Sequence, residues 1–368
     1  MKIECSKQKL QKAVLIAERA TSHNLSLPVL KNLILEVKKN NLVIKSTNLE
    51  IGLEVELPAK VLEEGMTSCN PTTLSNFLTN LKDEDKITVE LQNNNLLIKT
   101  STYNTVIKSE EYEDFPLIPK ISTTNKLKLK NTDLVYGLKS VIYAAAVSDI
   151  KPEISSVYIY QNNNELIFVA TDSFRLAEKK LTISNQNKDV DFRLIIPLKN
   201  AAEIIKVFEG EEGELELCSD SNQLSITSVG IHLTSRLIDG IYPDYRQIMP
   251  KTSTSTITLS KDDLGQVLKM ANIFSGKFNQ IKLDVDAAKE QIIIYSASSD
   301  IGESTATIKA KIEGNDFSAH YNARYILESF QSIPALNLLI GMTEPNRPLL
   351  IQGTENKSFS YIIMPVNR

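Results

Sequence analysis

The chain has 368 residues, of which 42% are hydrophobic and 23% charged, values that are typical of globular proteins and predict two or three domains. Its 41 basic and 45 acidic residues give a net charge of −4, which excludes a generally basic nucleic-acid-binding surface and confines any DNA contact to a local or topological one. Three widely spaced cysteines, a start without a signal-peptide core and the lack of any apolar run of about 18 residues predict a protein of the reducing cytoplasm.

Three helices begin alike, each after a short strand and a polar N-cap residue, at intervals of about 125 residues. The caps are Ser6, Asn131 and Ser260, whose side chains can accept hydrogen bonds from the first turn of a helix. A second helix follows in each repeat, twice with a proline at its first position, where a missing amide costs nothing. The predicted helices cover residues 6–20, 71–82, 131–146, 197–208, 260–275 and 322–333.

Strands fill the remainder of each repeat, because alternating runs rich in β-branched residues are separated by polar turns and so predict antiparallel hairpins. Hairpin turns are expected at 38–41, 162–165 and 286–289, further hairpins at 86–100, 213–228 and 337–354, and a last strand before each of Pro119, Pro250 and Pro365. Short Ser/Thr-rich linkers separate the repeats. The sequence therefore predicts an α+β chain of three repeated domains, each with two helices packed on antiparallel sheets, at residues 1–124, 125–254 and 255–368.

Positive charge is concentrated on the predicted helices, which carry eleven basic and six acidic residues although the whole chain is acidic. On the first helix Leu10, Val14 and Ala17 share one face, and Lys12 and Arg19 lie on the opposite face. Solvated helix faces with a random distribution of charge are an alternative explanation. The basic residues expected to meet DNA phosphates are Lys12, Arg19, Lys139, Lys199, Lys206 and Lys269.

Helix spacing limits the size of any ring that the helices line. At about 10 Å per helix, six helices enclose an opening of only about 9 Å, whereas the twelve helices of a dimer leave about 28 Å, which is enough for a DNA duplex. A chain that encircles DNA must therefore be a homodimer, and closed two-fold oligomers are the commonest kind.

No constellation of residues points to catalysis, a metal or a cofactor. His23, His232 and His320 lie in different repeats without a helical partner or a nearby cysteine. The glycines form neither a dinucleotide-binding turn nor a phosphate-binding loop, and Asp172-Ser173 lacks the flanking glycines of a nucleophile elbow. We therefore expect no enzyme, no metal and no cofactor.

Four short stretches are similar to a known family. Residues 170–177 (ATDSFRLA), 27–33 (LPVLKNL), 242–250 (YPDYRQIMP) and 361–368 (YIIMPVNR) resemble stretches of the bacterial DNA polymerase III beta subunit family, the sliding clamps, in the same order along the chain. The resemblance extends to the length and the threefold repeat. It implies the DNA clamp fold, a head-to-tail homodimeric ring that encircles double-stranded DNA without sequence preference and tethers the replicative polymerase without chemistry of its own.

The resemblance also implies a pocket between the second and third domains that binds short peptides of the polymerase, the clamp loader and repair proteins. Leu176, Ile248 and Ile362 are expected among its apolar walls, and Arg175 and Asn322 as its hydrogen-bonding groups. Binding should be weak, since each apolar anchor of a peptide is worth about 1.5–3 kcal/mol before the cost of association. Carried over position by position, the pocket consists of Ile154, Thr171, Ser173, Phe174, Arg175, Leu176, Pro243, Ile248, Phe278, Asn322, Tyr325, Asn346, Ile362, Met364, Pro365 and Val366.

The chain departs from the family at two places: Ser173-Phe174 stands where Gly-His is usual, and Val366-Asn367 stands where Met-Arg is usual. At the end of the fifth helix, Ile273 and Phe274 would be exposed in a lone chain, and the resemblance implies a contact between subunits there. The alternative that the net charge favours is a β-rich repeat scaffold that binds proteins but no DNA, and an enzyme comes third.

Overall fold

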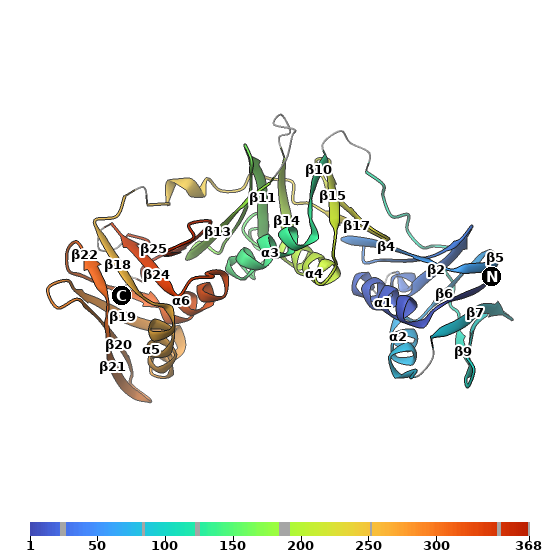
Figure 1. Cartoon of the computed structure of the whole chain (residues 1–368), viewed down its shortest axis with the longest axis horizontal. Coiled ribbons are helices and arrows are strands. Elements are labelled where there is room, and N and C mark those ends of the chain that lie inside the picture. Colours follow the sequence, from blue (N-terminus) through green and yellow to red (C-terminus); the bar gives the residue numbers. More distant parts are fainter. Residues whose placement is uncertain are drawn as a thin grey trace. The chain divides into compact units, whose positions relative to one another are not determined.

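The computed structural model describes residues 1–22, 27–82, 85–121, 126–183, 192–250, 252–343 and 347–366. It has the predicted α+β architecture, in which helices pack on antiparallel sheets (Figure 1). The chain divides into two compact units, residues 1–132 with 202–239 and residues 133–201 with 240–368. Each unit therefore combines one end of the chain with part of its middle third.

The first unit contains two sheets. The five-stranded sheet has the order β5 (Lys60–Glu63), β1 (Lys2–Ser6), β7 (Lys86–Gln92), β8 (Asn95–Lys99) and β9 (Asn104–Lys108). The eight-stranded sheet has the order β10 (Lys126–Lys130), β15 (Glu214–Ser219), β16 (Gln223–Ser228), β17 (Ile231–Arg236), β4 (Ile51–Pro58), β3 (Asn41–Thr47), β2 (Leu33–Lys38) and β6 (Gly65–Cys69). Because β4 pairs with β17, strands of the first and second predicted repeats share one sheet.

The second unit also contains two sheets. The nine-stranded sheet has the order β14 (Arg193–Pro197), β11 (Ser156–Asn162), β12 (Glu165–Thr171), β13 (Arg175–Thr182), β26 (Phe359–Ile363), β25 (Leu349–Gly353), β24 (Asn337–Met342), β18 (Ser255–Ser260) and β22 (Lys311–Glu313). The four-stranded sheet has the order β21 (Gly302–Lys309), β20 (Gln291–Ser298), β19 (Gln280–Asp286) and β23 (Phe317–Asn322). Here β13 pairs with β26, and strands of the second and third repeats share a sheet.

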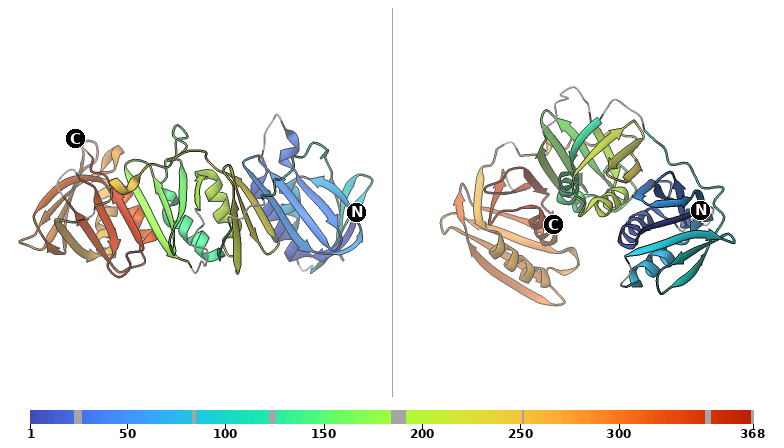
Figure 2. Two further views of the ribbon diagram at one scale, coloured as in Figure 1. Left: turned by 90° about the horizontal axis from the view of Figure 1, so that it is seen from above. Right: turned by 45° about the vertical axis from the view of Figure 1, so that its right-hand side comes forward.

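All six predicted helices are present in the part of the chain that the structure describes. They are α1 (Lys7–Ala17), α2 (Pro71–Asn80), α3 (Asn131–Val141), α4 (Leu198–Phe208), α5 (Lys261–Ile273) and α6 (Ala323–Ser329). Short 3-10 turns extend the first, third and sixth, at Glu18–Ala20, Ile142–Ala144 and Phe330–Ser332. The α5 helix packs across the four-stranded sheet, as the right-hand view of Figure 2 shows.

The predicted N-caps differ in how they work. The Ser260 hydroxyl accepts a hydrogen bond from the Asp263 amide at 3.2 Å, as expected. The Ser6 side chain makes no capping bond. Asn131 is the first helical residue of α3, and its side-chain amide donates to the Glu212 carbonyl instead. A polar residue before an amphipathic run thus located each helix start, but it did not determine the partner of its side chain.

Three sequence expectations that involve proline are wrong. Pro197 ends β14 rather than opening α4, because it pairs with Ser156 across the sheet. Residues 109–121 and 237–244, which precede Pro119 and Pro250, form no strand. Prolines lack the amide that a central strand needs. The two segments make other contacts: the Thr234 hydroxyl donates to the Pro119 carbonyl, and the Leu237 amide donates to the Asn222 carbonyl.

The α1 helix shows the expected two faces. Leu10, Val14 and Ala17 have no exposed surface, and Lys12 and Arg19 lie exposed. This helix packs on α2 and on β3 and β4. Among the described residues no helix is both long enough and apolar enough to cross a bilayer.

Candidate functional site

Two of the stretches that were singled out in the sequence lie side by side in the second unit. Leu176 of β13 lies opposite Ile362 of β26 in the antiparallel ladder. Beyond the ladder, the Met364 amide donates a hydrogen bond to the Phe174 carbonyl at 2.8 Å. The segment after β26 therefore follows the turn before β13, and a candidate site exists along this edge.

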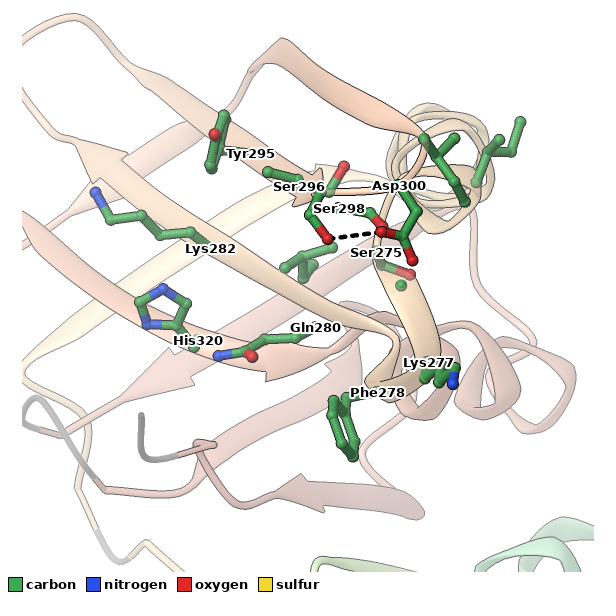
Figure 3. A pocket seen from close by; sticks show the side chains of 16 residues that line it. Ser275, Lys277, Phe278, Gln280, Lys282, Tyr295, Ser296, Ser298, Asp300 and His320 are labelled. Atoms are coloured by element: carbon green, nitrogen blue, oxygen red, sulfur yellow. Dashed lines mark hydrogen bonds between the residues drawn. The ribbon is translucent and has the colours of Figure 1, made fainter.

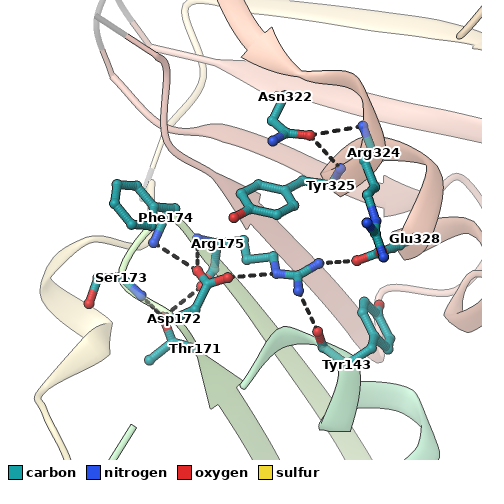
Figure 4. A network of polar contacts seen from close by, with 10 residues as sticks. All are labelled: Tyr143, Thr171, Asp172, Ser173, Phe174, Arg175, Asn322, Arg324, Tyr325 and Glu328. Carbon is teal, nitrogen blue, oxygen red and sulfur yellow. Dashed lines mark hydrogen bonds and ion pairs between the residues drawn. The ribbon is translucent and has the colours of Figure 1, made fainter. Parts of the chain in front are cut away.

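The turn between β12 and β13 is built around one carboxylate. Asp172 accepts hydrogen bonds from the amides of Phe174 and Arg175, both at 2.9 Å, and the Thr171 hydroxyl accepts from the Ser173 amide at 3.2 Å (Figure 4). Ser173 has φ of +76°, in the left-handed region, where a residue other than glycine costs about 1–2 kcal/mol. The side-chain bonds offset that cost, and the conformation explains why glycine is usual at this place in the resembled family.

Arg175 joins three segments at the centre of this region. Its guanidinium donates to the Asp172 carboxylate at 2.9 Å and to the Tyr143 carbonyl at 2.6 Å, and it also forms an ion pair with Glu328 (Figure 4). The guanidinium carbon lies 4.3 Å from the centre of the Tyr325 ring, a cation–π distance. Three of the five guanidinium N–H groups are thus engaged inside the protein.

Glu328 is held in its charged form at this hub. Burial opposes ionisation, but hydrogen bonds from Arg175 and Arg324 outweigh it and lower the pKa of the Glu328 carboxyl. Asn322, the other group expected to bond a peptide, caps α6 by accepting hydrogen bonds from the amides of Arg324 and Tyr325. The structure therefore uses much of the bonding capacity of Arg175 and Asn322 within the protein itself.

The expected apolar walls divide into surface and core residues. Leu176 and Ile362 have no exposed surface, so they support the site from beneath and do not line it. The exposed aromatic side chains are Phe174, with 64% of its surface accessible, and Phe278, with 80%. Further exposed or half-buried candidates are Ile154, Pro243, Ile248, Asn322, Tyr325, Met364, Pro365 and Val366, and Asn346 lies outside the described residues.

Phe278 lines a separate cavity of about 830 Å³ beside the four-stranded sheet (Figure 3). Ile273 at the end of α5 and His320 on β23 line the same cavity. The His320 carbonyl also accepts a hydrogen bond from the Val366 amide at 2.8 Å. This hydrogen bond connects the cavity wall to the C-terminal segment. The cavity itself is lined both by Phe278, predicted for the peptide pocket, and by Ile273, predicted for the subunit contact.

Three family models match consecutive parts of the chain. The model for the DNA polymerase III beta subunit N-terminal domain matches residues 1–119, that for the central domain residues 128–244, and that for the C-terminal domain residues 246–367. The chain belongs to the DNA polymerase III beta subunit family. The resemblance drawn from four short stretches is confirmed, and the chain is a sliding clamp, a processivity factor of DNA polymerase III that has no catalytic role of its own.

Individual members of the family match from end to end. The beta sliding clamp of Synechocystis sp. is 25% identical and aligns with 100% of this chain and 99% of its own length, and that of Streptococcus pneumoniae is 25% identical over 96% of both. The DNA polymerase III beta subunit of Thermotoga maritima has 22% identity and a TM-score of 0.93, and covers 100% of this chain and 99% of its own. The sliding clamp of Bacillus subtilis gives the same values, so the three-domain clamp fold is shown for the full length.

The basic residues predicted to face DNA are mostly neutralised by carboxylates in this clamp. Ion pairs hold at least four of the six, namely Lys12 with Glu211 (2.8 Å), Arg19 with Glu203 (4.0 Å), Lys206 with Glu203 (2.7 Å) and Lys199 with Asp149 (3.1 Å). Lys139 and Lys269 lie exposed on α3 and α5. The count of charges along the sequence did not reveal these ion pairs, which would compete with any phosphate at the same side chains.

The residues predicted for the contact between clamp subunits lie beside an edge strand. Ile273 has 55% of its surface exposed, and Phe274 is half-buried near Gly302, where β21 begins. β21 forms the edge of the four-stranded sheet, with one side of its backbone unpaired. An apolar side chain beside such an edge is the kind of surface that a second chain covers.

Sequence reasoning missed several residues of the site. Tyr143 and Glu328 bind Arg175, and Glu178 and Tyr245 form a buried pair nearby. A local signal was the charged run at residues 178–180 (EKK), which follows Leu176 and Ala177 within a strand. Within the described residues, no group of three or more His, Cys, Asp or Glu side chains is arranged to hold a metal ion.

Proposed function

We propose that two copies of this chain close head to tail into a ring around duplex DNA, and that the ring tethers the replicative polymerase, the clamp loader and other cytoplasmic partners by short peptides. Membership of the sliding clamp family supports the proposal. The domain limits at 124 and 254 belong to the same proposal. The observation that carries the tethering function is the edge along β13 and β26, where the exposed Phe174 of the turn at 171–175 meets the segment 364–366.

The DNA contact is proposed to be weak, independent of sequence and dominated by phosphates. Because carboxylates already pair with most candidate cations, a loaded ring is retained by closure around the duplex and not by affinity. The ring should therefore remain on a nicked circular plasmid and slide off the linear form. Equal loss from both forms would contradict encirclement and favour a protein-binding scaffold without DNA.

Two glutamates offer a direct test of the ion pairs. Replacing Glu203 and Glu211 by Gln releases Lys12, Arg19 and Lys206 from their partners. We expect tighter binding to linear DNA and a steeper fall of affinity with salt, since each additional phosphate contact adds about 0.9 to the slope of log K against log salt. A Glu165→Gln variant, which changes the charge on the β11–β12 turn of the other unit, serves as the control.

Truncation after Ile363 tests the peptide pocket. It removes Met364, Pro365 and Val366. The hydrogen bonds that the backbone amides of this segment donate to the carbonyls of Phe174 and His320 are lost with them. A peptide carrying Gln followed by Leu and Phe anchors should bind the intact chain with micromolar affinity, near −8 kcal/mol, and should not bind the truncated chain. The truncated chain should remain a dimer, and equal peptide affinity of both forms by calorimetry would refute the pocket.

The subunit contact is tested at the end of α5. The double variant Ile273→Ala with Phe274→Ala removes apolar surface beside the β21 edge and should convert the dimer into a folded monomer. Sedimentation below micromolar concentration measures the mass, and circular dichroism verifies the fold. An unchanged dimer mass would remove these two residues from the interface.

A further inference from the structure

Two candidate residues of the peptide pocket lie on a segment with almost no regular structure. Among the described residues between β17 and β18, the only element is a 3-10 turn at Tyr245–Gln247. The Tyr245 amide donates to the Pro243 carbonyl at 2.7 Å, and the Ile248 amide donates to the Tyr245 carbonyl at 3.1 Å. The position of Tyr245 therefore sets the positions of both Pro243 and Ile248.

The Tyr245 side chain is anchored in the interior of the second unit. Only 6% of Tyr245 is exposed, and its hydroxyl donates to the Glu178 carboxylate at 2.5 Å. The same hydroxyl lies 2.7 Å from that of Tyr160, which accepts a hydrogen bond from the Arg246 guanidinium at 2.8 Å. The Arg246 guanidinium also lies 5.1 Å from the centre of the Tyr160 ring.

These contacts form a chain of hydrogen bonds with a defined direction. Arg246 can only donate and an ionised Glu178 can only accept, so each tyrosine hydroxyl accepts from one neighbour and donates to the next. Burial, together with the negative charge of Glu178, raises the pKa of Tyr245 and keeps its hydroxyl protonated as a donor. A chain that ends in a cation and an anion is stronger than isolated neutral bonds.

Glu178 is an unusual residue for its position. It lies on β13 after Leu176 and Ala177, is 3% exposed, and has Lys180 as its charged partner at 3.3 Å. A buried carboxylate is costly unless hydrogen bonds and charges compensate it. Its cost is offset by bonds to the segment that carries Pro243 and Ile248, which ties that segment to the strand that also carries Arg175.

We propose that Glu178 is a positioning residue of the peptide pocket, which holds the wall formed by Pro243 and Ile248 in place through Tyr245 and Tyr160. The inference rests on the proposed peptide-binding function, and Glu178 itself touches no peptide. The strand β13 then determines the geometry of two walls of the pocket. The turn at 171–175 leads into its first residue, and the Glu178 side chain holds the segment 243–248.

Hydroxyl removal and carboxylate replacement test the proposal. Tyr245→Phe and Glu178→Leu should each weaken binding of the Gln-Leu-Phe anchor peptide by about three- to tenfold. Because both changes break the same hydrogen bond, the double variant should bind the peptide as tightly as the single variant with the lower affinity. Glu178→Gln keeps an acceptor oxygen of similar size and should restore near-normal affinity. Tyr321→Phe, which removes an equally buried hydroxyl with no hydrogen-bond partner among the described residues, is the control and should bind normally.

Fluorescence anisotropy with the labelled peptide measures affinity, and amide hydrogen exchange of residues 243–248 measures position independently of any ligand. Faster exchange of residues 243–248 in Tyr245→Phe, with unchanged exchange of the amides in β13, supports the proposal. Normal affinity and normal exchange in both Tyr245→Phe and Glu178→Leu would overturn it while leaving the pocket itself intact. If the unaltered chain binds no peptide, the proposed function fails, and the exchange result alone decides whether Glu178 positions the segment. If Glu178→Leu does not fold, Tyr245→Phe carries the test.

Discussion

Two strand pairings join the repeats of this clamp, and they are stabilised in different ways. In the first seam, β4 with β17, Leu53 lies opposite Leu233 and neither is exposed, while the charged pair Glu50 and Arg236 lies at the exposed end. In the second seam, β13 with β26, charged side chains are buried within the strand itself. Apolar burial closes both seams, since Leu176 and Ile362 of the second also have no exposed surface, but the second adds bonds of buried charged side chains that require one particular register.

The buried charges of the second seam reach beyond its two strands. Arg175 binds the segments of Tyr143 and Glu328, and Glu178 binds Tyr245. Lys179, on the opposite face of β13 from Glu178, donates to the hydroxyls of Tyr136 and Ser358. The comparison indicates that the seam beside the candidate peptide site combines apolar burial with polar contacts that position neighbouring segments.

The largest effect is expected from Arg175→Ala. It leaves Asp172 and Glu328 without their buried partner, and breaking such a pair costs about 4 kcal/mol. Urea unfolding followed by circular dichroism measures the loss, and hydrogen exchange should locate it in residues 175–179 and 359–363. A loss below about 1 kcal/mol would show that the charges do not hold the second seam.

The same hub predicts an acid sensitivity. Because the folded-state pKa of Glu328 is lowered, its contribution to stability is present above the pKa of an unfolded glutamate, about 4.3, and is lost as the pH falls through the lower folded value. Arg175→Ala should lose this part of the acid dependence. Glu328→Gln should lose it as well while retaining the fold, and an unchanged acid slope in both variants would contradict the role of the pair.

At the first seam, Leu233→Ala should destabilise the first unit by about 3 kcal/mol, the usual cost of a cavity left by a buried leucine. Since no charge is removed, the loss should be the same at pH 7 and at pH 5. Urea unfolding at the two pH values checks this. A loss that grows in acid would mean that the first seam also relies on ionised groups.

A smaller effect is expected from Lys179→Met. The ammonium contacts two hydroxyls and lies 4.5 Å from the centre of the Tyr136 ring. An apolar side chain of similar length keeps most of the packing, so the free energy of unfolding should change by no more than about 1 kcal/mol. Arg175→Ala should lower the free energy of unfolding much more, because Arg175 pairs with two carboxylates whereas Lys179 contacts two hydroxyls and a tyrosine ring. Similar losses in the two variants would contradict this difference.

The smallest effect concerns His232 on the first seam. Burial lowers the pKa of this imidazole, although Glu54 raises it in part. Below the unfolded pKa of about 6.5 the unfolded chain binds a proton that the folded chain does not, so stability falls with falling pH until the folded value is passed. His232→Gln should remove this slope between pH 7 and pH 5.5. Urea midpoints at both values measure it, and a retained slope would assign it to another group.

The repeat and its helices were predictable because local signals mark them. Ser260 before an amphipathic run and the polar turn at 162–165 located elements to within a few residues. The segments before Pro119 and Pro250 were mistaken for strands, since short apolar runs do not reveal whether a neighbouring strand is available to pair with them.

The site was less predictable than the fold. Family resemblance supplied Phe174 and Met364, whose backbones are hydrogen-bonded to one another. It did not reveal that Leu176 is fully buried or that the donors of Arg175 are engaged within the protein. These facts depend on contacts between residues about 150 apart, such as Arg175 and Glu328, and no local pattern encodes such contacts.

The wide separation of the paired strands has a consequence for synthesis of the chain. β4 is complete at residue 58 and β17 begins at residue 231, and β13 is complete at residue 182 whereas β26 begins at residue 359. At a ribosomal rate of about 5–20 residues per second, each edge waits roughly 9–35 s for its partner strand. A neighbouring nascent chain can pair with an open edge, and charged residues such as Glu54 and Lys179 hinder that pairing. We therefore expect the charges within these strands to reduce pairing between growing chains before they contribute to the finished clamp.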